Sequence, residues 1–130
     1  MLPTPPSRPA LGPIGEEIAA RALADRGYRI LERNLRSRVG EIDLLATEGE
    51  TLVAVEVKAR TVKDASRMPH FGRPAEAVTA TRLSRLERAV EDYCHRVHRP
   101  PGPCRIDVVE VLLSPKGEVL KLVVLRNVTG

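Results

Sequence analysis

The sequence predicts an α/β fold in which a mixed β-sheet of about five strands is flanked by helices. Two observations support this prediction. Residues 13–26, and the stretch from near Pro74 to Pro100, carry apolar side chains at the intervals of three and four that are typical of amphipathic helices. β-prone runs bounded by Gly, Pro and polar turn residues lie before and after the second helix. A helix between strands predicts a parallel crossover, and hairpins predict antiparallel pairs, so we expect a mixed sheet.

The first helix is expected over residues 13–26. Pro13 suits a first turn, Glu16 and Glu17 would complement the helix dipole there, and Gly27 ends the helix. Its narrow apolar stripe is predicted to contain Ile14, Ile18, Ala22 and Leu23.

Strands are expected over residues 28–38, 40–46, 52–60, 104–113 and 118–125. The second helix should begin near Pro74, and its core stripe is predicted to contain Leu83, Leu86, Val90, Tyr93 and Val97. Residues 61–73 show no sustained period and hold a proline and a glycine. A lid over substrate and plain disorder both remain open for this connection.

With 130 residues, the chain is expected to form one domain over residues 12–130, preceded by a disordered proline-rich lead over residues 1–11. No apolar run approaches the roughly 18 residues that a membrane span needs, and the N-terminus lacks a hydrophobic signal core. We therefore expect a cytoplasmic protein with no membrane partner. Cys94 and Cys104 are expected to be reduced thiols, because they lack a zinc-type spacing.

Charged side chains interrupt two otherwise apolar strands. Asp43 lies in Gly40–Ala46, and Glu56 and Lys58 lie in Leu52–Lys58. Burying an unpaired charge costs several kcal/mol, roughly, so this arrangement needs a partner. A divalent metal ion with an anionic substrate behind it fits best, since Mg²⁺ prefers carboxylate oxygens.

Alternation places Glu56 and Lys58 on one face of their strand. If Thr47–Glu50 forms a four-residue loop, Asp43 pairs with Ala54 and becomes the diagonal neighbour of Glu56, within about 7–8 Å between backbones. Asp43 and Glu56 could then hold Mg²⁺ or Mn²⁺, with the Val57 carbonyl as a further ligand. Lys58 would stabilise charge in the transition state of phosphodiester hydrolysis. By the same alternation, Ile42 and Leu44 should share a core face.

Simpler interpretations of these residues stay open. The Glu56–Lys58 face could be a solvated sheet surface, and Glu16 and Glu17 could serve only the helix dipole. The chain has a net charge of +4 and a pI near 9.5, which suits a nucleic-acid partner. Asp107 is interpreted as structural, paired with an arginine. The predicted phosphate contacts, for which a solvated surface is the alternative, are Arg33, Arg36, Arg38, Arg60 and Arg82.

At these residues the chain resembles a known family. An Asp followed by Glu-x-Lys resembles the signature of the PD-(D/E)XK nuclease superfamily, which has a restriction-endonuclease-like fold. The fold of this superfamily also resembles that of archaeal Holliday-junction resolvases. Within the superfamily, the chain is more similar to one branch, the YraN-like family of small bacterial proteins. The resembling motifs are Gly12-x-x-Gly15-Glu16, Gly27-Tyr28-x-Ile30-Leu31-x-Arg33-Asn34, Gly40–Leu44, Val55–Lys58 with Arg60, Phe71-Gly72-x-Pro74-x-Glu76-Ala77-Val78, Arg85-Leu86 with Ala89 and Tyr93, and Cys104–Val109.

The resemblance implies that Glu16 joins Asp43, Glu56 and Lys58 at a metal centre. Ile42 stands where the superfamily's signature has proline. The implied function is Mg²⁺-dependent endonuclease cleavage of DNA, with branched DNA among the candidate substrates. A nucleic-acid-binding module without turnover is the alternative, and a protein-binding scaffold is a third hypothesis. A two-fold symmetric substrate would suit a homodimer.

Overall fold

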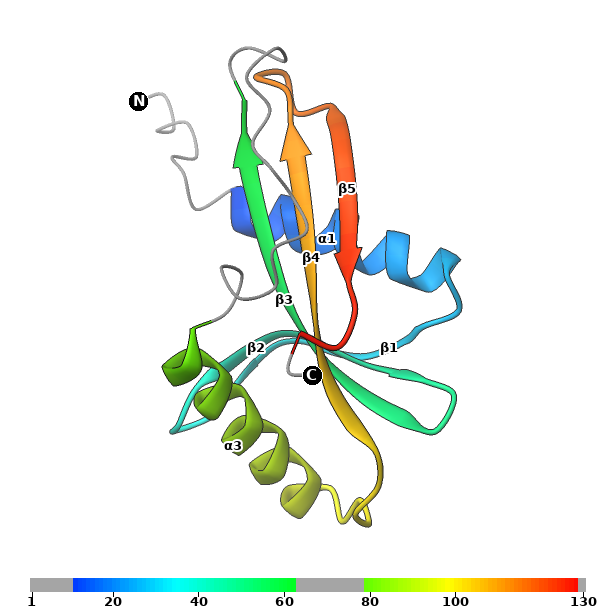
Figure 1. The fold of residues 1–130 in the computed structure, drawn as a ribbon, viewed down its shortest axis with the longest axis vertical. Helices are drawn as coiled ribbons and strands as arrows, with labels where there is room; N and C mark the ends of the chain where they lie inside the picture. The colour runs from blue at the N-terminus through cyan, green and yellow to red at the C-terminus, as the bar shows by residue number, and fades with distance from the viewer. Residues whose placement is uncertain (1–10, 63–78, 129–130) are drawn as a thin grey trace, which may run out of the picture.

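The computed structural model describes residues 11–62 and 79–128. Its elements, in chain order, are α1 (Leu11–Asp25), β1 (Arg29–Arg36), β2 (Glu41–Glu48), β3 (Thr51–Thr61), α3 (Ala80–Arg96), β4 (Cys104–Leu113) and β5 (Val119–Leu125) (Figure 1). The strands form one sheet in the order β1-β2-β3-β4-β5, in which β3 and β4 are parallel and the other neighbours antiparallel. The predicted mixed α/β fold is confirmed. The proline-rich lead, the 63–73 connection and residues 74–78 lie outside the described residues.

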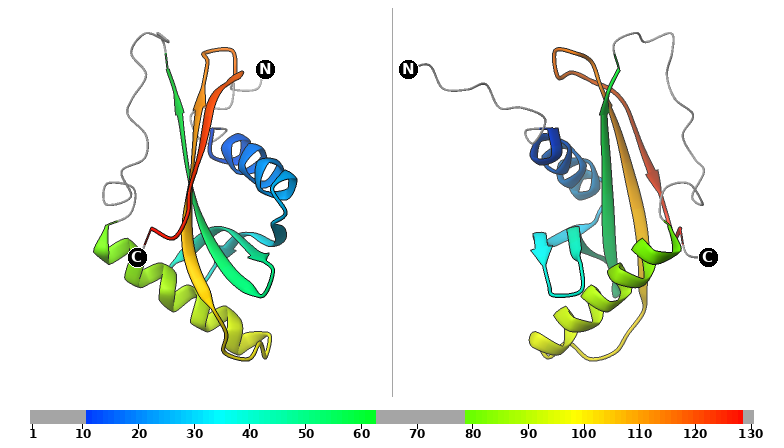
Figure 2. Two further views of the ribbon diagram at one scale, coloured as in Figure 1. Left: turned by 45° about the vertical axis from the view of Figure 1, so that its right-hand side comes forward. Right: turned by 90° about the vertical axis from the view of Figure 1, so that its left-hand side faces the viewer.

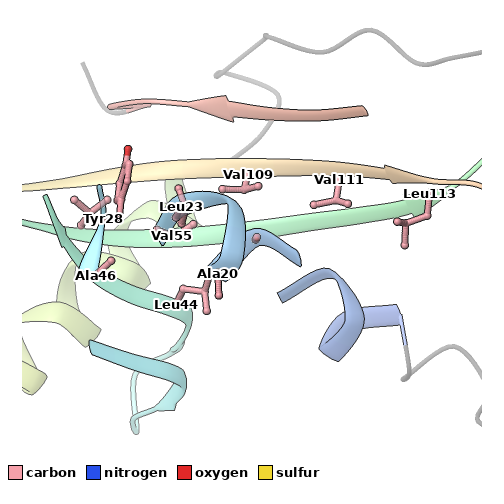
Figure 3. Close-up of a cluster of buried hydrophobic side chains, with 11 residues drawn as sticks. Ala20, Leu23, Tyr28, Leu44, Ala46, Val55, Val109, Val111 and Leu113 are labelled. Atoms are coloured by element: carbon pink, nitrogen blue, oxygen red, sulfur yellow. The ribbon is translucent and has the colours of Figure 1, made fainter. Parts of the chain in front are cut away.

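The two helices cover opposite faces of the sheet (Figure 2). On the α1 face, Ala19, Ala20 and Leu23 pack against alternate residues of β2, β3 and β4, together with Tyr28 (Figure 3). On the other face, Leu86, Ala89 and Val90 of α3 pack against a second set that includes Leu45, Ala54 and Ile106. Because successive side chains of a strand point to opposite faces, one sheet contributes apolar residues to two cores.

Helix α1 begins at Leu11, slightly earlier than predicted. Glu16 and Glu17 therefore lie in its second turn, so the helix dipole does not account for them. The predicted apolar stripe is also wrong in part. Ile14 is 46% exposed, whereas Ala19 and Ala20 are buried beside Leu23, because the small alanines let α1 approach the sheet closely. Gly27 ends the helix as expected, with a φ of 92°.

Helix α3 begins at Ala80. Thr79 is extended and its side chain accepts a hydrogen bond from the Arg82 N–H, so the predicted start near Pro74 is wrong. The predicted core stripe is largely confirmed, since Leu86 and Val90 are buried and Leu83 and Tyr93 pack against the same cluster; Val97, beyond the end of α3, is exposed. Within residues 11–62 and 79–128, no helical segment combines the length and the apolarity that crossing a bilayer requires.

The turn between β2 and β3 is shorter than predicted. Glu48 pairs with Thr51, so the turn is Gly49–Glu50, with Gly49 at a φ of 59°. The register therefore differs by two residues from the expected one. If it is extended beyond its last pair, Leu44 and Val55, Asp43 lies opposite Glu56 rather than diagonal to it. A shift of two residues does not by itself move a side chain to the other face.

Ile42 and Leu44 lie two residues apart on β2 but pack in different cores. Ile42 belongs to the core under α3 and Leu44 to the core under α1, so the prediction that they share a face is wrong. Asn34, on the neighbouring strand between the partners of Ile42 and Leu44, has a left-handed φ of 52°. The irregular backbone of β1 and the broken alternation of β2 thus lie side by side next to Asp43.

Asp107 is structural, as predicted, and it is paired with an arginine. It is fully buried and accepts hydrogen bonds from Arg105 Nε at 3.0 Å and from the Tyr28 hydroxyl at 2.8 Å. The Asn127 N–H donates to it as well, at 2.8 Å. These bonds tie the end of β5 and the start of β1 to β4 and satisfy the buried carboxylate.

Gly15 fixes the distance between α1 and β3. A Cβ at this position would lie 2.6 Å from the Ala59 Cβ, closer than two side chains can approach. The close contact brings the next residue, Glu16, against the sheet. Gly12 lies in the same helix, but a Cβ there would meet nothing within 4 Å.

We predict that Gly15→Ala lowers the free energy of unfolding by about 1–3 kcal/mol, because overpacking must push α1 away from β3. Gly12→Ala is the matched control and should change stability by less than about 1 kcal/mol. Urea denaturation of both variants measures the difference. Equal stability of the two variants would show that the Gly15 contact is not restrictive.

Candidate active site

Asp43 lies where β2 and β3 begin to separate. The paired residues end at Leu44 and Val55, and beyond them the Val57 N–H donates to Asp43 Oδ2 at 2.8 Å. Burial raises the pKa of Asp43 to about 6, and the nearby charges of Glu56 and Glu16 also raise it. The Val57 hydrogen bond and the charge of Arg82 act in the opposite direction. Asp43 is therefore a carboxyl group whose surroundings disfavour its negative charge.

Glu16 reaches the same region from α1, on the other face of the sheet. Partial burial raises its pKa, as does the charge of Glu41. Its neighbour Glu17 is engaged elsewhere, since it pairs with Arg21 and with Arg33 on β1. The two adjacent glutamates thus differ in environment, and it is Glu16 whose charge acts on Asp43.

Glu56 faces α3 and is held by Arg82. The guanidinium donates from Nε to Oε2 at 3.1 Å and from Nη2 to Oε1 at 3.1 Å and to Oε2 at 2.8 Å. Only 15% of the Glu56 side chain is exposed, against 37% for Arg82. Both carboxylate oxygens are therefore occupied by a bidentate, partly buried ion pair.

Lys58 is half-buried on the same face of β3 as Glu56, two residues on. It makes no hydrogen bond or ion pair with any of residues 11–62 or 79–128. Between them, Val57 points its side chain into the α1 core and uses its N–H to hold Asp43. The predicted role of the Val57 carbonyl as a metal ligand stays a prediction.

Glu41 is a member of the site that sequence reasoning missed. Its charge acts on both Glu16 and Arg82. The signal was available, because Glu41 precedes Asp43 by two residues in the same motif. The chain, whose net charge is +4, therefore contains an acidic cluster formed by Glu16, Glu41, Asp43 and Glu56. Arg82 is a cation that interacts electrostatically with three of these four carboxylates, those of Glu56, Asp43 and Glu41.

The oxygen donors of this cluster suit Mg²⁺ or Mn²⁺. In this conformation, however, residues 11–62 and 79–128 hold no group of three His, Cys, Asp or Glu side chains arranged to bind a metal ion. At Glu56, moreover, both carboxylate oxygens are bound to Arg82. A cation at Asp43 and Glu56 thus requires Arg82 to release the carboxylate.

The predicted phosphate-binding arginines have different surroundings. Arg33 is paired with Glu17, Arg82 with Glu56, and Arg60 is exposed near the end of β3. Arg36 and Arg38 line two adjoining open hollows between the β1–β2 turn and α3, which we call the basic groove although Glu41, Glu91 and Asp92 also line it. The arginines of this basic groove are Arg36, Arg38, Arg82, Arg85, Arg88 and Arg96. Arg85, Arg88 and Arg96 were not predicted as phosphate contacts. Their placement outside the apolar stripe of the predicted helix was the signal that could have identified them.

The raised pKa of Asp43 predicts that this residue lowers stability at neutral pH. Because the folded state binds the Asp43 proton more tightly than the unfolded state, stability is lost as the pH rises from about 4 through about 6. Asp43→Asn keeps the shape of the side chain but cannot ionise, so this loss of stability should be absent in the variant. The variant should match the natural protein near pH 4 and exceed it by up to about 3 kcal/mol at pH 7.

Urea unfolding of both proteins between pH 4 and 8 measures this difference. Asp25→Asn, at the exposed end of α1, is the control for a simple loss of charge. A stability difference between Asp43→Asn and the natural protein that does not change with pH would contradict the prediction.

Comparison with known proteins identifies the family. The uncharacterised protein family UPF0102 matches residues 15–111, which include every residue of the acidic cluster. A UPF0102 protein of Symbiobacterium thermophilum is 48% identical over 109 residues, covering 84% of this chain and 87% of that protein. One from Caldicellulosiruptor saccharolyticus is 43% identical over 117 residues, covering 90% and 94%. One from Streptomyces griseus is 45% identical over 112 residues, covering 85% and 89%. The chain therefore belongs to the UPF0102 family.

Proposed function

We propose that this protein is a metal-dependent endonuclease that hydrolyses DNA phosphodiester bonds, with a PD-(D/E)XK type of active site. The observation that supports this most is the gathering of Glu16, Asp43 and Glu56 from α1, β2 and β3 where two strands separate. Such a concentration of carboxylates in a basic protein is costly unless a cation binds there.

Each residue has a distinct role in the proposal. Asp43 and Glu56 are the metal ligands, and Glu16 is an accessory ligand or positions the attacking water. Bound Mg²⁺ would supply charge neutralisation at the phosphate and a more acidic water. Lys58, on the same face as Glu56, stabilises negative charge as it develops on the phosphate oxygens.

Arg82 acts as a stand-in cation in the absence of metal. Its bidentate contact with Glu56 neutralises the carboxylate that the metal needs. Once displaced, the guanidinium remains beside the site and is suited to bind the substrate phosphate. Arg36, Arg38 and Arg85 line the same groove as Arg82 and would extend this phosphate contact along DNA.

Arg82→Gln should therefore tighten Mn²⁺ binding, because the metal no longer competes with the guanidinium for Glu56. We expect Kd to fall at least about fivefold, equivalent to about 1 kcal/mol. Isothermal titration calorimetry with Mn²⁺ measures this. Arg88→Gln removes an exposed arginine of the same helix and should leave Kd unchanged. Weaker Mn²⁺ binding by Arg82→Gln would show that Arg82 does not compete with the metal.

The activity itself is tested with Mg²⁺ or Mn²⁺ and a panel of duplex, single-stranded, flap and four-way DNA. Cleavage should fall about 100-fold or more in Asp43→Asn, Glu56→Gln and Lys58→Met. Glu16→Gln should lower cleavage, whereas Glu17→Gln should not, because Glu17 pairs with Arg21 and Arg33 on the surface. If no preparation cleaves any substrate above the background measured with Asp43→Asn, the proposal is rejected.

A nucleic-acid-binding module without turnover is the second candidate. It is favoured by the Glu56–Arg82 ion pair, which holds a predicted metal ligand, and by the basic groove beside it. DNA binding that survives both EDTA and Glu56→Gln, with no cleavage of any substrate, would favour the module. A homodimer acting on a symmetric substrate belongs to the nuclease proposal.

A further inference from the structure

Glu110 is a buried carboxylate that the proposed mechanism does not use. It lies in β4 and is only 6% exposed. Its Oε2 atom is fully buried and has no hydrogen-bond partner. A buried, unsatisfied carboxylate oxygen is rare in a native structure and costly to maintain. An unsatisfied group of this kind in a native structure calls for an explanation, such as a role in binding or positioning.

The backbone register identifies the neighbour of Glu110. In the parallel β3–β4 pair, Lys58 is its register partner. Register partners point to the same face of a sheet, so the two oppositely charged side chains are adjacent. No ion pair joins them in this conformation. Lys58 has a flexible four-carbon side chain, so its ammonium can change direction without movement of the backbone.

Other charges on this face are less suited to the role. Glu56 is the diagonal neighbour of Glu110 but has the same sign, and its carboxylate is already bound to Arg82. Lys121 of β5 is a diagonal neighbour on the other side, since Val123 pairs with Glu110. Lys121 is exposed. Lys58 is the half-buried cation directly beside Glu110.

We propose that Glu110 is a positioning residue that holds the ammonium group of Lys58 beside Glu56. The inference deepens the proposed function, because it rests on the role given there to Lys58. Glu110 itself touches no substrate. Its carboxylate fixes the direction of a flexible lysine, which reduces the entropy lost when Lys58 meets developing charge.

A double-mutant cycle in urea tests the pair without any assay of activity. Lys58→Met should lower the unfolding midpoint by about 0.5 M or more, because it leaves Glu110 buried without a counter-charge. In the E110Q background, the same change should have less than a quarter of this effect. Lys121→Met is the matched control and should act equally in both backgrounds.

Equal effects of Lys58→Met in the two backgrounds would overturn the proposal. Coupling of Glu110 to Lys121 instead of Lys58 would overturn it as well. If a Lys58 variant fails to fold, a second experiment tests the pair. The natural protein and E110Q are acylated with an N-hydroxysuccinimide ester, and the rates at individual lysines are compared. The sequence holds four lysines, so mass spectrometry can follow Lys58 relative to Lys116. We expect the relative rate at Lys58 to rise at least threefold in E110Q, and an unchanged rate contradicts the pair.

The catalytic consequence is measured separately. Where DNA is cleaved, E110Q should lower kcat about tenfold with little change in KM, and Glu110→Asp should restore part of the loss. If no DNA is cleaved by any preparation, the proposed nuclease function fails, while the cycle still reports on the Lys58–Glu110 pair. If cleavage is intact in E110Q, the positioning role fails and the nuclease proposal stands.

Discussion

The β2–β3 ladder ends at Leu44 and Val55, and beyond it the Val57 N–H donates to the Asp43 carboxylate. The opening between the strands lets groups from both faces of the sheet act on one point. Glu16 approaches from α1, and Arg82 from α3. Without this separation, the sheet would keep the two helices from acting on a shared site. Gly15, which permits the close approach of α1 to β3, is part of the same constraint.

Electrostatics give this opening its chemical character. Burial and neighbouring carboxylates raise the pKa of Asp43 to about 6, while Glu56 is ion-paired with Arg82. The Arg82 guanidinium thus offsets part of the negative charge of the acidic cluster. A divalent cation would replace the guanidinium at Glu56 and would favour the ionised form of Asp43. In the proposed mechanism, the same exchange would free Arg82 to face the basic groove, which would couple metal and substrate binding through a single side chain.

Much of this arrangement follows from the sequence because strand alternation is local. Apolar periodicity located α1, α3 and the strands, and it placed Glu56 and Lys58 on one face. The turn is two residues shorter than predicted, and the resulting register shift of two residues does not by itself exchange the faces of the strand. The interpretation of Asp107 also held, because a lone acid in an apolar strand needs a partner.

The remaining features depend on contacts between residues far apart in sequence. Arg82 is 26 residues from Glu56, and alternation does not reveal which helical arginine reaches the sheet. The division of Ile42 and Leu44 between two cores lies beside the left-handed backbone of Asn34 on β1, and no hydrophobic pattern encodes either feature. Glu110 escaped notice because its burial depends on the neighbours of β4 in the folded sheet. Functional candidates of this kind emerge only when the register is known.

The central claim is that Arg82 occupies, at Glu56, the place of a cation. A crystal structure of the natural protein soaked in Mn²⁺, with anomalous diffraction data, tests it most directly. The account predicts an anomalous peak within about 2.0–2.3 Å of carboxylate oxygens of Asp43 and Glu56, with the Arg82 guanidinium turned away from Glu56. An intact Arg82–Glu56 pair at saturating Mn²⁺, with no peak beside Asp43, would contradict it.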